Sequence, residues 1–269
     1  MPQFINTNIS SLNTQRNLNK SQGSLSTSIQ RLSSGLRVNS AKDDASGLAI
    51  ATRMESQIRG SNQAVRNAND GISLAQTAEG ALGMIQANLA RMRELAVQGA
   101  NATSNADIES INGEFTQLSV ENSRVTQMTL FNNIALLSAP VNHTFQVGAN
   151  SVPGVDELTV STSALNLTST TLGDSSRTAQ AEIAKLDADI NAVSNLRAAF
   201  GAIQSRFETA ISALQVNAEN QTASRSRIMD TDYASETSNL ARAQILQQAG
   251  TAMQAQANTS LNGVLTLLR

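Results

Sequence analysis

Hydrophobic residues recur every three or four positions between residues 46 and 98, and no proline interrupts this stretch. Such spacing places apolar side chains on one face of a helix, as a seam for another helix. The stripe consists of Ile72, Ala75, Ala78, Leu82, Ile85, Leu89, Met92, Leu95 and Ala96. A helix of roughly 50 residues is about 80 Å long and cannot bury its stripe alone. We therefore expect other segments of the chain to cover it.

A second long helix is predicted over residues 176–220, because two rows of apolar residues follow a strict heptad there. One row places residues seven apart at Leu186, Val193, Phe200, Phe207 and Leu214. The other row comprises Ile183, Ile190, Leu196, Ile203 and Ile211. Four heptads of this kind are typical of a coiled coil, and we expect this helix to lie along the helix of residues 46–98.

Shorter helices are predicted on either side of these two. Residues 6–33 place Leu18, Leu25 and Leu32 seven apart, and a last helix spans residues 233–269. After a loop of turn-forming residues at 99–105, apolar residues recur at helical spacing as far as Phe131, Asn132 and Asn133. We expect this segment to fold back on the first long helix as an antiparallel hairpin.

Glycine, serine, asparagine and proline interrupt the helical pattern in three places. Two are linkers at residues 34–45 and 221–232, and in the first of them Asp43 and Asp44 are interpreted as helix-start residues. The third, residues 138–175, contains two β-prone runs and predicts a small hairpin. The predicted fold is mainly α, a long antiparallel coiled-coil bundle of a terminal helix pair and a helical core. The terminal helices are predicted at residues 1–33 and 233–269, and the linkers at 34–45 and 221–232. The helical core is predicted at residues 46–137 and 176–220, and the hairpin region at 138–175.

Both terminal helices carry apolar residues, and within the chain each helix has only the other to cover them. A pair of helices is too small to be stable in water by itself. We infer that the ends order against other subunits, which makes the terminal residues candidates for self-assembly. The candidates are Ile5, Ile9, Leu12, Leu18, Leu25, Leu32, Leu240, Met253, Leu261, Val264 and Leu268.

Composition excludes several classes of function. There is no cysteine for disulfides or thiol catalysis, and a net charge of -2 without a basic stripe argues against nucleic-acid binding. The single histidine, His143, is poor evidence for a metal site, and no nucleophile elbow or phosphate loop is present, so an enzyme and a cofactor are not expected. The sequence has no run of about 18 apolar residues, so membrane insertion is not expected. Its first residues also lack the pattern of a secretory signal peptide. Export would require a dedicated route.

Several motifs resemble those of bacterial flagellin, and together they are highly specific. They lie at both ends and extend inward, at residues 5–8, 12–13, 31–50 (RLSSGLRVNSAKDDASGLAI), 93–98, 145–150 (FQVGAN), 227–234 (RIMDTDYA), 236 and 264–269. The resemblance implies a subunit that polymerises into the extracellular flagellar filament. It also implies export through the flagellum's type III channel, assembly under a filament cap, contact with hook-filament junction proteins and a chaperone on the carboxyl-terminal helix. Because about 35 residues separate the two helical regions, the family's large variable surface domains are expected to be absent.

The resemblance further implies that an innate Toll-like receptor recognises the monomer. The positions that match the family's receptor-binding residues are Arg91, Leu95 and Glu114, and Met92 stands where many relatives carry valine. Two alternatives share part of this pattern: a hook-filament junction protein, and a coiled-coil stalk or signalling protein. A zinc peptidase insertion, which some flagellins carry, needs two histidines and is excluded.

Overall fold

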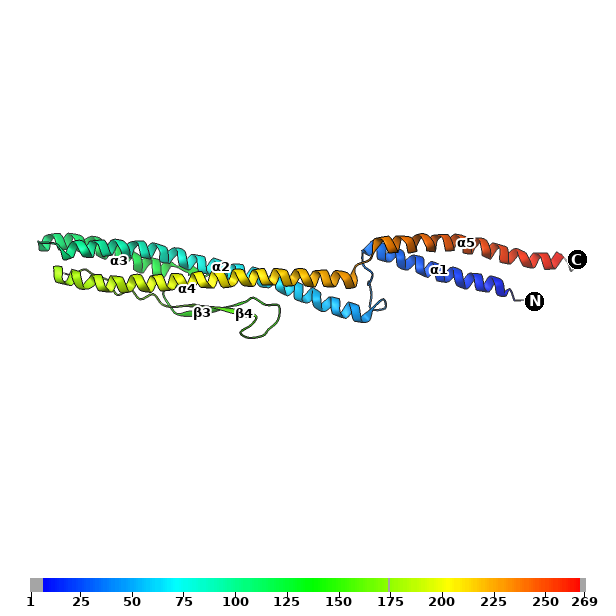
Figure 1. Cartoon of the computed structure of the whole chain (residues 1–269), viewed down its shortest axis with the longest axis horizontal. Coiled ribbons are helices and arrows are strands. Elements are labelled where there is room, and N and C mark those ends of the chain that lie inside the picture. Colours follow the sequence, from blue (N-terminus) through cyan, green and yellow to red (C-terminus); the bar gives the residue numbers. More distant parts are fainter. Residues whose placement is uncertain (1–6, 174, 267–269) are drawn as a thin grey trace. The chain divides into compact units, whose positions relative to one another are not determined.

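The computed structural model describes residues 7–173 and 175–266, without the side chains of residues 105 and 260–266. These residues form five helices and two small antiparallel hairpins (Figure 1). The helices are α1 (Ile9–Ser34), α2 (Ala45–Ala100), α3 (Asn105–Met128), α4 (Ser176–Met229) and α5 (Tyr233–Thr266). The strands are β1 (Leu130–Phe131), β2 (Ile134–Ala135), β3 (Val141–Gln146) and β4 (Glu157–Thr162). The predicted mainly-α class with a central hairpin is confirmed.

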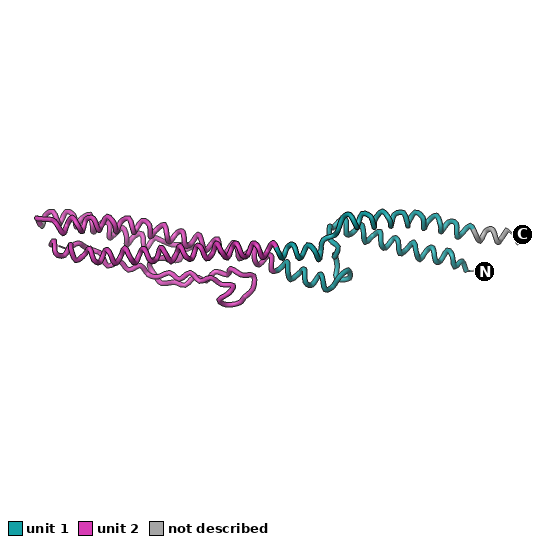
Figure 2. Tube along the Cα trace, in the orientation of Figure 1, with its two compact units in different colours: residues 1–56, 220–269 teal, residues 57–219 magenta. Residues whose placement is uncertain are grey.

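The chain divides into two compact units, coloured separately in Figure 2. Unit 1 comprises Met1–Ser56 and Asn220–Arg269, and unit 2 comprises Gln57–Glu219. The division falls inside α2 and α4, so each of these helices contributes residues to both units.

The core of unit 2 is built on the two predicted seams. Most of the α2 stripe is buried, and so are the α4 residues Leu186, Val193, Phe200 and Phe207. Side chains that bridge the helices advance along α2 as they recede along α4. The bridges are Glu79 with Gln204, Gln86 with Arg197, and Arg93 with Asp187. α2 and α4 are therefore antiparallel, as predicted.

Two glycines of α2 admit bulky side chains from the segments that cover the helix. A Cβ atom at Gly71 would lie 2.5 Å from the Phe207 ring, and one at Gly99 would lie 2.7 Å from Leu172. Glycine destabilises a helix relative to alanine, but at these two positions it lets α4 and the segment before α4 approach the α2 backbone. Close approach matters here because the core contains few aromatic side chains to fill a wider gap.

The helix α3 folds back along α2, as predicted. Asn88 donates to Asn122 at 2.9 Å, and Arg91 Nε lies 2.9 Å from Glu114 Oε1. The predicted end of this helix at residues 131–133 is wrong, because α3 ends at Met128 and β1 and β2 follow. Asn132 and Asn133 turn between these strands with φ angles of 47° and 66°. Asparagine tolerates this left-handed conformation, which a two-residue hairpin turn requires at both positions.

The predicted central hairpin is formed by β3 and β4, in the register that pairs Phe145 with Leu158. The Phe145 ring packs edge-on against Phe207 of α4, with 5.6 Å between ring centroids. The chain then passes along α3 as a segment without regular secondary structure, residues 163–173. The buried carboxylate of Asp189 holds this segment by accepting hydrogen bonds from the Thr168 amide and hydroxyl and from the Ser169 amide.

In unit 1, the segment between α1 and α2 is ordered by caps. Gly35 ends α1 with a φ of 72°, and its amide donates to the Arg31 carbonyl. Asp44 accepts from the Gly47 amide at 2.8 Å and so caps α2, as predicted. Asp43 instead closes the loop, accepting from the Ser40 hydroxyl and from the amides of residues 39 and 40. These hydrogen bonds, with that of the Ser40 hydroxyl foremost, lower the pKa of Asp43, and the bond from Gly47 foremost lowers the pKa of Asp44.

The predicted linker at residues 221–232 is mostly helical, because α4 continues to Met229 and only residues 230–232 separate it from α5. Tertiary contacts support this last part of α4 although its sequence is polar. Arg225 pairs with Glu55 at 3.2 Å, and Met229 packs in a small cluster with Val38 and Ala51.

Candidate assembly surfaces

The terminal helices α1 and α5 lie side by side (Figure 1) and meet at two heptad rows of buried and half-buried positions. On α1 these are Ser11, Thr14, Leu18, Ser21, Leu25, Ser28 and Leu32. On α5 they are Glu236, Leu240, Ala243, Gln247, Gly250, Gln254 and Ala257. More than half of these side chains are polar or absent, so the seam buries little apolar surface. The terminal pair is therefore weakly stabilised by its own contacts.

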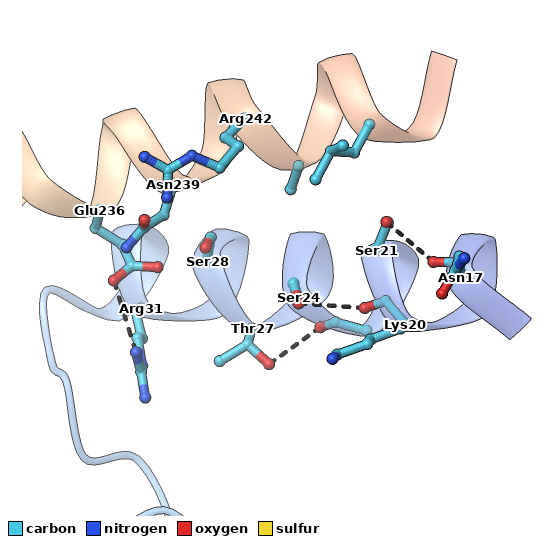
Figure 3. A pocket seen from close by; sticks show the side chains of 13 residues that line it. Asn17, Lys20, Ser21, Ser24, Thr27, Ser28, Arg31, Glu236, Asn239 and Arg242 are labelled. Carbon is cyan, nitrogen blue, oxygen red and sulfur yellow. Dashed lines mark hydrogen bonds and ion pairs between the residues drawn. The ribbon is translucent and has the colours of Figure 1, made fainter. Parts of the chain in front are cut away.

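Polar contacts join the two helices near both ends of the seam. Asn8 donates to the Ala257 carbonyl at 3.0 Å, and Gln254 donates to the Ser11 hydroxyl at 2.6 Å. At the other end Glu236 of α5 reaches toward Arg31 of α1 (Figure 3), although 3.6 Å separates the paired atoms.

An open groove of about 840 Å³ between α1 and α5 contains this ion pair, with Lys20 and Arg242 also in its lining. Two buried side-chain atoms on these helices, Nε of Arg31 on α1 and Oε1 of Gln254 on α5, have no hydrogen-bond partner among the described residues. Each unpaired buried polar atom costs free energy, which further weakens the contact between α1 and α5.

Apolar side chains that the seam does not cover stand exposed on both terminal helices. On α1 they are Ile9, Leu12 and Ile29, and on α5 they are Ile245, Leu246 and Met253, all more than half exposed. On α5 these residues lie on a different side from the α1-facing row, so apolar residues occur around much of the helix. A helix with this distribution is normally buried on several sides. The terminal pair thus presents surface that other molecules would cover.

The positions expected to bind a receptor are brought together by α2 and α3 in unit 2. Arg91 and Glu114, each about half exposed, form an ion pair at 2.9 Å, and Arg91 also contacts Glu94 at 3.0 Å. The hydrogen bond to Glu114, followed by that to Glu94, raises the pKa of Arg91. Leu95, one turn after Arg91, is only 2% exposed and belongs to the core of unit 2. The exposed part of the site is therefore the charged pair.

The described residues offer little for catalysis. No group of three histidine, cysteine, aspartate or glutamate side chains that could hold a metal ion occurs among them, and His143 is half-buried on β3. Within residues 7–173 and 175–266, no helix is long and apolar enough to cross a membrane.

Comparison with known proteins identifies the family. The bacterial flagellin N-terminal helical region matches residues 5–141, and the bacterial flagellin C-terminal helical region matches residues 183–268. The chain is 44% identical to a flagellin of Halalkalibacterium halodurans over 99% of this chain and all of that protein. The chain belongs to the bacterial flagellin family. It is also 42% identical to a flagellin of Xenorhabdus nematophila over the full length of both chains.

As a flagellin, the chain is a structural subunit that self-assembles into the extracellular flagellar filament. This finding favours the filament subunit over the junction-protein and stalk alternatives. A Salmonella typhimurium flagellin is 58% identical over 157 residues, which cover 58% of this chain and 32% of the relative. The present flagellin fits the short form of the family.

In this flagellin the predicted assembly residues fall into groups. Leu18, Leu25, Leu32 and Leu240 are half-buried in the seam, whereas Ile9, Leu12 and Met253 are exposed. Leu261 and Val264 lie in α5, but their side chains are outside the described residues, as are Ile5 and Leu268 altogether.

Ile245 was missed as an assembly candidate from the sequence. Its signal is a second row of positions on α5 at alternating spacings of four and three. This row contains Arg242, Ile245, Ala249 and Ala252.

Proposed function

We propose that the α1 and α5 pair is the element through which this flagellin polymerises, with residues 1–33 and 233–269 forming the inner part of the filament. The observation that carries the proposal is the exposure of Ile245, Leu246 and Met253 on α5, outside the row of positions that packs against α1. Contacts with neighbouring copies would bury these side chains. They would also supply the stability that the half-polar seam lacks.

In the same proposal the other parts of the chain have supporting roles. Residues 46–137 and 176–220 form the helical core around the inner part, and residues 138–175 cover it as a hairpin region. Residues 34–45 connect α1 to α2, and residues 230–232 connect the end of α4 to α5. The capped loop around Asp43 and Asp44 supports a connection of defined geometry in the first of these segments.

Seeded elongation tests the assembly role. The full chain should extend short filament fragments, and a chain lacking about the first 30 and last 35 residues should not. A finer test replaces one exposed apolar residue, Leu12→Gln, beside Asn19→Gln on an exposed polar position of the same helix. We expect Leu12→Gln to slow elongation about tenfold, because a buried leucine contributes roughly 1.5–3 kcal/mol, while Asn19→Gln elongates normally. Equal elongation by both variants would contradict the proposal.

The remaining partners follow from the same role. We propose that an export chaperone covers α5 before assembly, because a helix with apolar residues on several sides would otherwise associate prematurely. A filament cap and hook-filament junction proteins would contact the two ends of the polymer. We propose no enzymatic activity for this flagellin, because the family to which it belongs is structural.

We also propose that an innate Toll-like receptor recognises the monomer at Arg91 and Glu114, with the buried Leu95 holding the underlying helix surface in place. The exposed ion pair on adjoining helices supports this second function. Arg91→Ala should reduce receptor signalling by monomers. Arg124→Ala, which removes another half-exposed arginine paired with Glu121 on α3, is the matched control. Unchanged signalling by Arg91→Ala would refute the assignment.

A further inference from the structure

Methionines of this flagellin differ sharply in exposure. Met92 is fully buried and Met229 is 8% exposed, whereas Met84, Met128 and Met253 are 57%, 64% and 60% exposed. Exposed thioethers react with peroxide or hypochlorous acid to give the sulfoxide, and buried ones are shielded. Exposed methionines on the described surface are thus sites of oxidation in a protein that works outside the cell.

Met253 differs from the other two exposed methionines in its position. Met84 lies on α2 and Met128 at the end of α3, where the Met128 sulfur accepts a hydrogen bond from Arg124 at 2.8 Å. Met253 lies on α5, on the same face as the exposed Ala249, one turn before it, and the exposed Leu246, two turns before it. Its side chain therefore belongs to an exposed apolar strip with Leu246 and Ala249, and neither of these residues has a side-chain donor for a new oxygen atom.

We propose that Met253 is an oxidation-sensitive site that controls incorporation into the filament: its sulfoxide form is excluded from the growing polymer. This inference rests on the proposed role of α5 in polymerisation. The assembled filament would in turn shield Met253, so that sensitivity is confined to subunits that have not yet been incorporated.

The chemistry is an oxygen-atom transfer. A lone pair of the Met253 sulfur attacks one oxygen of hydrogen peroxide, the O–O bond breaks, and a sulfur–oxygen bond forms. The other oxygen leaves as water after proton transfer. The sulfur loses two electrons and the peroxide gains them. The product carries a strong hydrogen-bond acceptor, which is costly to bury in an apolar contact without a donor. Methionine sulfoxide reductase restores the thioether, so the block is reversible.

Partial oxidation followed by assembly tests the proposal within one sample. Monomers are treated with hydrogen peroxide until about half of the exposed methionines are oxidised, the peroxide is removed, and filament seeds are added. Filaments and remaining monomers are then separated, and the sulfoxide at each methionine is measured by mass spectrometry. We expect Met253 sulfoxide to be enriched about tenfold or more in the monomer fraction, because burying an unpaired polar group changes an equilibrium by that order. Met84 sulfoxide provides the internal comparison.

Two variants provide an independent test. Met253→Leu keeps an apolar side chain of similar volume but cannot be oxidised, and Met84→Leu is the matched control. After the same peroxide treatment, Met253→Leu should elongate like untreated protein, and Met84→Leu should be inhibited like the oxidised parent chain. Equal partitioning of Met253 sulfoxide between filament and monomer would overturn the proposal. Failure of the untreated parent chain to elongate would instead overturn the assembly role of α5, and the inference with it.

Discussion

Gly71 of α2 lies against the ring of Phe207, so that replacing it with alanine tests how closely α2 and α4 pack. The added Cβ would lie 2.5, 2.8 and 2.9 Å from three ring carbons, distances at which atoms must move. The ring has little freedom to withdraw, because Phe207 is 1% exposed and Phe145 packs against it edge-on. Overpacking of this kind costs roughly 1–3 kcal/mol, and three close contacts place Gly71→Ala near the upper end.

Alanine also favours the helix over glycine by about 1 kcal/mol, which offsets part of the cost. We expect Gly71→Ala to lower the free energy of unfolding by about 1–2 kcal/mol. Gly80→Ala, about two and a half turns further along the same helix, is the matched control, since no atom lies within 4 Å of its new Cβ. It should gain up to about 1 kcal/mol from helix propensity alone.

Urea unfolding of the monomeric variants, followed by circular dichroism of the helices, measures both effects. If Gly71→Ala were as stable as Gly80→Ala, the ring would not restrict the helix and the reasoning would be wrong. The double variant Gly71→Ala with Phe207→Leu adds a further check. Because the smaller side chain leaves room for the new methyl group, the two substitutions should couple favourably rather than add.

Three further predictions concern carboxylates. Asp189→Ala removes the hydrogen-bond acceptor for Thr168 and Ser169 and should destabilise unit 2 by about 2–4 kcal/mol. The amide hydrogens of residues 163–173 should then exchange faster than in the parent chain. Asp44→Ala removes the α2 cap and should lower the melting temperature. Asp44→Asn should retain most of the stabilisation, because asparagine is also a good helix cap. The pKa values of Asp43 and Asp44 are lowered by folding, so their stabilisation is complete above about pH 4 and is lost as the pH falls through the folded-state values. Hydrogen exchange of the loop at pH 2–6 measures this loss, and protection that rose on acidification would contradict it.

The long helices follow from the order of residues along the chain. The heptad of Leu186, Val193, Phe200 and Phe207 predicts a buried face, and all four are buried, because the period of a helix alone decides which side chains share a side. The cap at Asp44 was similarly predictable, since it depends on residues within one turn. Local chemistry suffices wherever the interacting groups are neighbours in sequence.

The ends of α3 and α4 required knowledge of the tertiary structure. The sequence predicted a break near Asn220, but contacts of Arg225 with Glu55 and of Met229 with Val38 support helix to Met229. Partners about 170 to 190 positions away in the chain leave no local signal. The turn at Asn132 and Asn133 was hidden for a related reason, because the apolar residues before it fit either a helix or a short strand.

The candidate assembly surface divides in the same way. The sequence by itself determined that Leu12, Leu25 and Met253 are apolar residues on terminal helices. Only the structure decided that Leu25 faces the partner helix within the chain while Leu12 and Met253 face solvent. A heptad places residues on one side of a helix but does not say which side meets which partner, because that choice depends on how the two helices are rotated against each other. The burial of Leu95, one turn after the half-exposed Arg91 on α2, was likewise decided by which side of the helix the core covers.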